Sequence, residues 1–468
     1  MSRMRSVPAI LGGLSIVGAL ATPAHAVDHN PGGLDKTFGK RGKVITRLGA
    51  RVFAAEAARA PDGAAYVAAN TGPPGVNLKG GRIVVLRYDG RGRHTRGFGT
   101  RGVARVALPQ GPATVGGMAV QADGRIVLVG SAGGDVLVLR LTRKGGLDRS
   151  FSGDGIQTLD LGSAYEGGTD AAVQSDGSML VVGSIGTTSA AAGPVGDGFV
   201  ARYRRDGRAD AQFGSGGVVI LRRFQDDGYL DAQAVALLDD GRILVGGNSG
   251  VVYRDLNLAT VALLRHDGTP ETQLSPTGIA YPGLANGILR ELTRDTRTGR
   301  IYLAGSVLPQ AGGSEEFFLM ALRADLTRDD SFGEFGVARS SLRDGSQDLA
   351  TSAVVDPHGR ILLGGTALAS PAPRARGSFA LARFLPNGRV DKAFGRRGWV
   401  RTTFGLGWNV ARALLLQPRG HLLAVGSNAS AELGDTGPAI TVARYRLGRN
   451  SGQAPRRPPG VHAGANTR

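Results

Sequence analysis

The sequence predicts an all-β protein, a seven-bladed β-propeller with four antiparallel strands in each blade. A motif anchored by an aromatic residue, first seen at Phe38, returns six more times along the 468 residues, at intervals of 53 to 62 residues. Each repeat contains four strand-like segments, and none shows helical spacing of apolar residues over a useful length. A long repeat with two hairpins fits a propeller blade, whereas an open β-solenoid, the alternative, has shorter rungs.

Each repeat begins at a corner motif, whose first copy is Gly33–Val44. A short strand follows, Val44–Leu48 in the first repeat, and then a run that ends at a turn such as Asp123-Gly124, which is typical of a tight hairpin. The next strand, such as Ile126–Val129, is apolar on both faces, which indicates burial between two neighbouring blades. A last strand ends at an arginine that every repeat carries: Arg87, Arg140, Arg202, Arg265, Arg323, Arg383 and Arg444.

Two glycine positions recur. The glycine four residues after the aromatic anchor is present in every repeat, which predicts a backbone with positive φ at the corner. It stands at Gly42, Gly102, Gly155, Gly217, Gly278, Gly336 and Gly398. A second glycine ends the buried strand in six repeats, and we expect it to face a neighbouring blade closely. It stands at Gly130, Gly183, Gly246, Gly305, Gly364 and Gly426.

The arginine and a corner acid eight residues later predict ion pairs within the blades. The pairs are Arg140 with Asp148, Arg202 with Asp210, and Arg383 with Asp391. Because catalysis needs asymmetry and these pairs occur once per blade, we interpret them as braces of the corner.

The two ends of the array complement each other. No arginine strand precedes Asp35, and no corner acid follows Arg444. We therefore expect Val44–Leu48 to be the outer strand of the last blade, so that an N-terminal strand closes the ring and Asp35 pairs with Arg444.

The chain divides into three parts. Residues 1–26 have the charged start, short apolar run and Ala24-His25-Ala26 site of a secretory signal peptide. Residues 27–446 hold the propeller, and residues 447–468 read as a disordered basic tail rich in Pro and Gly. We expect export by the general secretory route to the periplasm or the cell exterior, with no membrane span. The chain has no cysteine, so we expect its stability to come from a large core.

The formal net charge of +18 raises the question of an anionic partner. The arginines are spread along the chain instead of clustering, so we attribute the charge to background composition and expect no nucleic acid partner. We expect a monomer.

No motif for a catalytic, metal or cofactor site is present, and we predict none. The candidate contact residues are Asp170, Asp231, Asp348 and Trp408. Two function classes stay open. One is a binding or interaction module for a glycan, an envelope polymer or a protein, which is the favoured class. The other is a glycan-active enzyme, a lyase or hydrolase, with carboxylates near the propeller axis.

Connections between strands suggest where recognition occurs. Those that share a face with the corners are nearly constant, whereas those on the opposite face vary in length and composition, as recognition loops on a rigid scaffold do. The variable connections are Thr71–Gly81, Ile185–Asp197, Phe224–Leu230, Ser249–Leu258, Val307–Glu316, Arg343–Leu349, Ala367–Ser378 and Asn428–Ala439.

The pattern Leu-Asp-x-x-Phe-Gly-x-x-Gly, followed by Asp-Gly-Arg-Ile-Leu-Val-Gly-Gly and Ala-Arg-Tyr, resembles the delta-60 repeat family of bacterial secreted propellers. The resemblance covers nearly all of residues 27–446 and implies the propeller architecture, but no activity. The fifth repeat departs from the pattern with Leu274-Ser275-Pro276, so we expect its blade to be irregular.

Overall fold

The computed structural model describes residues 31–49, 51–72, 82–108, 113–189, 193–222, 228–251, 256–308, 313–342, 346–369, 376–405, 407–429 and 438–448. The predicted signal segment 1–26 lies outside the described residues, as do residues 449–468 of the predicted tail. No helix that is long and apolar enough to cross a membrane occurs in the described part of the chain.

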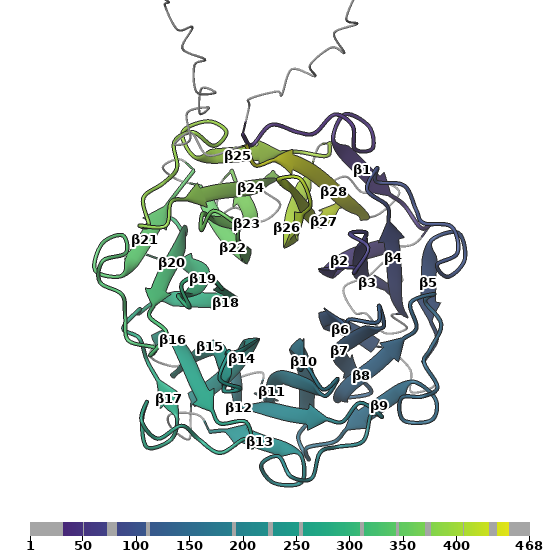
Figure 1. Cartoon of the computed structure of the whole chain (residues 1–468), viewed down its shortest axis with the longest axis vertical. Coiled ribbons are helices and arrows are strands. Elements are labelled where there is room, and N and C mark those ends of the chain that lie inside the picture. The colour runs from purple at the N-terminus through teal and green to yellow at the C-terminus, as the bar shows by residue number, and fades with distance from the viewer. Residues whose placement is uncertain are drawn as a thin grey trace, which may run out of the picture.

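The strands form antiparallel units of four around a central space (Figure 1). In each unit an inner strand pairs with a second, the second with a third, and the third with a short outer strand. Each unit is named below after its inner strand. The first three units are β2 (Arg51–Arg59), β3 (Ala65–Gly72), β4 (Arg82–Tyr88), β5 (Val103–Val106); β6 (Ala113–Val120), β7 (Ile126–Ala132), β8 (Asp135–Leu141), β9 (Ile156–Leu159); and β10 (Tyr165–Val173), β11 (Met179–Ser189), β12 (Gly193–Tyr203), β13 (Val218–Leu221).

The remaining units follow the same order around the central space. They are β14 (Gly228–Leu237), β15 (Ile243–Val251), β16 (Leu256–Leu264), β17 (Ile279–Ala280); β18 (Gly287–Arg294), β19 (Ile301–Val307), β20 (Glu316–Leu322), β21 (Val337–Ser340); β22 (Gln347–Val355), β23 (Ile361–Leu368), β24 (Gly377–Phe384), β25 (Trp399–Thr402); and β26 (Trp408–Gln417), β27 (His421–Ala429), β28 (Ala439–Arg446) with β1 (Lys43–Thr46). A single parallel pair, Gly196 with Tyr229, links the β10 and β14 units into one eight-stranded sheet.

Strand β1 is the first in sequence but lies in the same unit as the last. It pairs antiparallel with β28, with Lys43 opposite Ala443 and Thr46 opposite Ile440. The backbone before β1 continues this contact, because the Asp35 N–H donates to the Arg444 carbonyl at 2.8 Å. This is the pairing that the complementary ends of the repeat array predicted, although the strand begins and ends slightly earlier than Val44–Leu48.

The hydrophobic core consists of layers between neighbouring units. The second strands are buried on both faces, and every residue of β19 is buried, as the apolar sequence pattern predicted. One layer joins the last unit to the first: Val52 and Val67 of the β2 unit pack in the same cluster as Leu423 and Val425 of the β26 unit. Apolar packing is therefore continuous between the last unit and the first.

The glycines that recur at the corner of every repeat have φ between +69° and +101°, as predicted. In four units the arginine does more than brace its own corner. Arg140 Nε lies 2.7 Å from Asp148 Oδ2, and its guanidinium lies 5.0 Å from the centre of the Phe151 ring. The same guanidinium donates to the Arg205 carbonyl of the next unit at 2.6 Å. The predicted blade-internal pair is thus also a link between two units.

Three further arginines repeat this arrangement. Each pairs with a corner acid at 2.7–2.9 Å, stacks on the anchor phenylalanine at 4.6–4.8 Å, and donates to a carbonyl of the following unit. The sets are Arg202 with Asp210, Phe213 and the His266 carbonyl; Arg383 with Asp391, Phe394 and the Leu447 carbonyl; and Arg444 with Asp35, Phe38 and the Gly90 carbonyl. The last set joins the β26 unit to the β2 unit.

One sequence interpretation needs correction, and another is confirmed. The inner strands begin earlier than the predicted runs Met118–Gln121 and Ala234–Leu238, because a β-bulge interrupts the alternation that marks a strand. The outer strand β17 has two residues where the other outer strands have four, which agrees with the irregular corner of the fifth repeat.

The second recurring glycine has a different neighbour from the one we expected. A Cβ atom on Gly130 would lie 1.9 Å from the Thr114 carbonyl oxygen, which belongs to the inner strand of its own unit. Gly183, Gly305 and Gly426 meet the same obstacle at 1.9–2.0 Å. The predicted close approach of a neighbouring blade holds for three of the six: Gly246 and Gly364 would meet leucine side chains of the following unit, and Gly426 would also meet Phe379 of the preceding unit at 2.8 Å.

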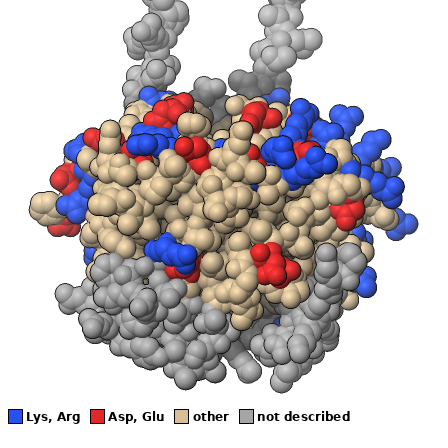
Figure 2. Space-filling model, turned by 90° about the horizontal axis from the view of Figure 1, so that it is seen from below, with Lys and Arg blue, Asp and Glu red and all other residues tan. Residues whose placement is uncertain are grey.

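Exposed cations collect at the corners in space, although they are spread along the sequence. Figure 2 shows one side of the ring, on which Lys and Arg gather along one edge while the middle carries few charges. Exposed residues of the described corner segments include Lys40, Arg91, Arg96, Lys144 and Arg149.

Replacing the acid that joins the two ends of the chain should weaken the whole ring. Asp35 and Arg444 side chains are 4% and 10% exposed, so Asp35→Asn leaves a buried guanidinium without its counter-charge. We expect a loss of roughly 3 kcal/mol in the free energy of unfolding, measured by urea denaturation. The matched control is Asp330→Asn, whose carboxylate is 60% exposed beside Arg328, with a loss below about 1 kcal/mol. Equal losses in the two variants would contradict the role of the pair.

Candidate functional site

The inner strands carry a β-bulge at one common level. At this level two residues of the inner strand stand opposite one residue of the second strand, and the extra residue turns its side chain away from the regular alternation. The extra residues are Ala55, Gly116, Thr169, Gln233, Arg290, Thr351 and Arg412.

Polar side chains of the preceding unit hold these bulges in place. The Asn70 amide accepts a hydrogen bond from Val115 N–H at 2.8 Å and donates to the Val115 carbonyl at 3.1 Å, one residue before the bulge of β6. Ser427 Oγ accepts from Ala54 N–H at 2.7 Å in the same way, across the junction between the last unit and the first. Asn248 and Ser306 bind Leu289 and Ala350 equivalently. Four of the bulges, in β2, β6, β18 and β22, are therefore held by a side chain of the preceding unit.

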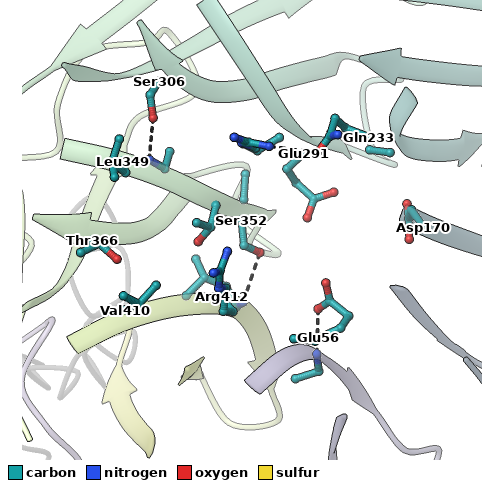
Figure 3. Close-up of a pocket in the computed structure, with 18 of the residues that line it drawn as sticks. Glu56, Asp170, Gln233, Glu291, Ser306, Leu349, Ser352, Thr366, Val410 and Arg412 are labelled. Atoms are coloured by element: carbon teal, nitrogen blue, oxygen red, sulfur yellow. Dashed lines mark hydrogen bonds between the residues drawn. The ribbon is translucent and has the colours of Figure 1, made fainter. Parts of the chain in front are cut away.

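The bulges line a cavity of about 640 Å³ on the axis of the ring. Three acids reach it from different units: Glu56 from β2, Asp170 from β10 and Glu291 from β18. Figure 3 shows their carboxyl groups directed toward one common space, with Arg412 on the side of β26. Arg290 also lines the cavity, and its guanidinium donates to Gln233 Oε1 at 3.2 Å.

The acids follow the bulged residue directly and bind nearby backbone. Glu56 accepts from Ala57 N–H at 2.7 Å, and Glu291 accepts from Leu292 N–H at 3.0 Å. Asp170 accepts from Ala171 N–H at 2.7 Å and, through its other oxygen, from Val235 N–H of β14 at 2.9 Å. The fold does not need an acid here, because the same position carries glycine in β6 and alanine in β26, and both strands form the bulge. The choice of acids therefore indicates a second purpose, although Asp170 also binds the neighbouring strand.

The environment of the cavity disfavours ionised carboxylates. Burial raises the pKa of Glu56 to about 8, and the negative charge of Asp170 contributes. Burial raises the pKa of Asp170 to about 6. Burial, followed by the charges of Asp170 and Glu56, raises the pKa of Glu291 well above its ordinary value. All three residues are only partly buried and line the axial cavity, so a solute can reach their carboxyl groups. Carboxyl groups with raised pKa values can donate hydrogen bonds when protonated as well as accept them.

A second cavity of about 420 Å³ adjoins the first, between the β6, β10 and β14 units. The two cavities share Gly116, Thr169 and Gln233 in their walls. Tyr165 and Tyr229 line the second cavity.

The wall between the β22 and β26 units carries the other aromatic residue of the site. Trp408 begins β26 and lines the axial cavity with 48% of its surface exposed. Thr366 lines the same part of the cavity and is 2% exposed, and its hydroxyl has no hydrogen-bond partner among the described residues.

The structure places the predicted contact residues differently. Asp170 lies in the axial cavity, and Trp408 lies at its edge. Asp231 lies on β14 in the adjoining cavity, where it accepts hydrogen bonds from Ser184 and Gln233, and burial raises its pKa. Asp348 is fully buried and accepts from Leu342 N–H at 2.6 Å. It holds the segment that enters β22.

The variable connections lie largely outside the described residues. The parts without a described structure are residues 73–81, 190–192, 223–227, 252–255, 309–312, 343–345, 370–375 and 430–437.

Sequence analysis missed Glu56, Glu291, Arg290 and Arg412. A signal was present: Glu56 and Asp170 both stand seven residues before the glycine of the following turn. Glu291 stands eight residues before Gly299 because that turn is longer. Repeated position relative to the turn, combined with a charge inside an otherwise apolar strand, would have identified these residues.

A separate acidic group lies where the β6 unit meets the β10 unit. One carboxylate oxygen from each of Asp135, Asp160 and Glu166 lies within 4.8 Å of the others. Glu166 is fully buried and accepts hydrogen bonds from Leu161 N–H and Ser163 N–H at 2.7–2.8 Å. We interpret Glu166 as a brace of this connection.

Comparison with known proteins agrees with the fold. A family model described as "Domain of unknown function (DUF5122) beta-propeller" matches residues 121–151 and 174–213. No curated protein matches the chain.

Solved structures resemble it at low identity. One is a protein from Lactobacillus plantarum (12% identity, TM-score 0.45, covering 78% of this chain and 92% of that one). Another is polysaccharide lyase Uly1 (10% identity, TM-score 0.44, covering 88% of this chain and 93% of that one). A third is the PQQ-bound aldose sugar dehydrogenase of Streptomyces coelicolor (11% identity, TM-score 0.35, covering 86% of this chain and 98% of that one). The family model and the arrangement of the sheets together make this chain a β-propeller.

The raised pKa of Glu56 predicts that the stability of the protein falls as the pH rises. Its pKa rises from an ordinary 4.5 to about 8 in the folded protein, so the folded state binds the proton more tightly than the unfolded state over that interval. Raising the pH through it therefore favours unfolding. We expect Glu56→Gln to remove part of this fall and to be more stable than the parent by about 2 kcal/mol at pH 9, because cavity water screens the full effect.

Urea denaturation at pH 5, 7 and 9 measures the difference. Glu334→Gln, which removes an exposed acid at a corner, is the matched control and should follow the parent protein at each pH. Parallel pH profiles for the parent and Glu56→Gln would show that the Glu56 carboxyl ionises as it does in the unfolded chain.

Proposed function

We propose that this chain is an exported, closed seven-bladed propeller of the delta-60 repeat type that binds a polar ligand in its axial cavity. The repeat count, the four-strand units and the pairing of β1 with β28 support the closed ring. The signal-like residues 1–26 support export. The ligand enters from the face of the variable connections, because the inner strands begin at that face.

One observation carries the binding function. Glu56, Asp170 and Glu291 converge with Arg290 and Arg412 on one cavity, from four separate inner strands. Placing charges on an axis costs free energy, and the fold forms without an acid at this position, since the equivalent strands carry Gly117 and Ala413. Charged groups that the fold does not require, gathered in a concave site, are typical of ligand recognition.

A glycan-active enzyme is the second candidate, because the pKa values of Glu56 and Asp170, about 8 and about 6, lie apart within one cavity. A carboxyl group that stays protonated at neutral pH can protonate a glycosidic oxygen, while an ionised one can accept a proton from water. This candidate predicts cleavage of the ligand in addition to retention.

Binding is tested by the thermal stability of the purified protein with panels of polar solutes: oligosaccharides, polyamines, nucleotides and short peptides. We expect one panel to raise the melting temperature of the parent protein and of Glu334→Gln, but not of the double variant Asp170→Asn, Glu291→Gln. Analysis of the same mixtures for new reducing ends separates the enzyme from the binder. A shift in the double variant equal to that of the parent, or no shift with any panel, would overturn the axial site.

Export is tested by expressing the full chain in a bacterial host and fractionating the cells. We expect the mature protein outside the cytoplasm, and retention of the precursor when Arg3 and Arg5 are both replaced by Glu, because secretory signals need a positive start. A cytoplasmic parent protein would contradict this part of the proposal.

A further inference from the structure

Aromatic residues stand at a repeated position near the start of three inner strands, where Trp408 lines the axial cavity and Tyr165 and Tyr229 line the adjoining second cavity; this end of the two cavities is called the mouth below. Tyr165, Tyr229 and Trp408 each lie four residues before the bulge of their inner strand. Tyr165 and Trp408 are 53% and 48% exposed, whereas the anchor phenylalanines at the corners are 0–1% exposed. Exposed aromatic rings that flank a cavity are flat apolar surfaces available to a ligand.

The surface beside Tyr165 carries no side chain at Gly167, although the fold does not require glycine there. Gly167 does not have a positive φ, and a Cβ atom placed on it would find its nearest neighbour, the Tyr165 hydroxyl, at 3.5 Å. A side chain would fit there without strain. Because Gly167 lines the second cavity, the absence of a side chain leaves that cavity open beside Tyr165.

Deeper in the site the groups are hydrogen-bonding ones. Beside the three carboxyl groups and two guanidinium groups lie the Gln233 amide and the Thr366 hydroxyl. The Thr366 hydroxyl is a buried group without a partner among the described residues, and such a group costs free energy unless a ligand or water binds it. It points to an occupant with hydroxyl or carbonyl groups.

We propose that the ligand is a linear glycan that lies across the mouth, with sugar rings stacked on Trp408 and Tyr165 and hydroxyl groups bound by the acids between them. A pyranose ring has an apolar C–H face and a rim of hydroxyl groups, which match the flat aromatic rings and the mixed donors and acceptors of the cavity. This inference rests on the proposed axial site and specifies its substrate class.

The positions of the aromatic residues require a ligand longer than one sugar. The β26 and β10 units lie on opposite sides of the central space in Figure 1, so a molecule in contact with both Trp408 and Tyr165 must cross the axis. A chain in this path passes over Glu56, Asp170 and Glu291.

The experiment measures affinity by calorimetry for short and long members of several series: cello-, chito- and malto-oligosaccharides and oligogalacturonates. For a long oligosaccharide that binds the parent protein, Trp408→Ala and Tyr165→Ala should each lower the affinity about tenfold, which is typical for the loss of one stacked ring. A short oligosaccharide of the same series should respond to only one of these substitutions.

Phe335→Ala is the matched control, since Phe335 is 73% exposed at a corner, away from the mouth, and its removal should leave the affinity unchanged. If a polyamine, nucleotide or peptide binds at the acids and no oligosaccharide does, the glycan inference fails and the axial site stands. If nothing binds, both fail. If an oligosaccharide binds with unchanged affinity to both aromatic variants, the path across the mouth is wrong.

Discussion

The structure depends on the close approach of each bulged inner strand to the second strand of its own unit. A carbonyl oxygen of the inner strand occupies the place where a Cβ atom of the second strand would stand, so that Gly130 has room for no side chain. The bulge bends the inner strand and turns an extra side chain toward the axis. The close approach admits at most a methyl group: the equivalent position is glycine in six units and Ala69 in the β2 unit, whose inner strand forms the same bulge. The small residue, the bulge and the cavity therefore belong to one constraint.

The corner arginines provide a second constraint, because they link neighbouring units. In Arg140, Arg202, Arg383 and Arg444 the guanidinium uses its charge for the corner acid, its flat face for the anchor phenylalanine and a remaining N–H for a carbonyl of the following unit. A lysine could not satisfy three partners in these directions, because it lacks the planar fork. This explains why the same residue type recurs at the end of each third strand. Neighbouring units are thus held at the periphery by arginines and near the axis by side chains such as Asn70 and Ser427.

Much of the fold could be predicted from the sequence, because a repeat displays its rules several times. The corner glycines, the buried second strands and the partner of β1 all followed from comparing one repeat with another. The start of the inner strands could not be predicted in this way, because a bulge breaks the two-residue alternation at the place where the strand faces the axis. The site was predicted only in part. Asp170 and Trp408 were among the predicted contact residues and line the cavity. Glu56 and Glu291 were missed, because only the folded chain brings their distant strands around a common centre.

The pairing of β1 with β28 joins residues about 400 positions apart in the chain. A contact of such sequence separation forms late, because its loop-closure entropy must be offset by structure that already exists between the two ends. Until β1 pairs with β28, the outer edge of β28 can accept any extended peptide, including β1 of a second molecule. The short connection from β1 to β2 keeps the local concentration of β1 high, which favours pairing within one chain over exchange of strands between copies.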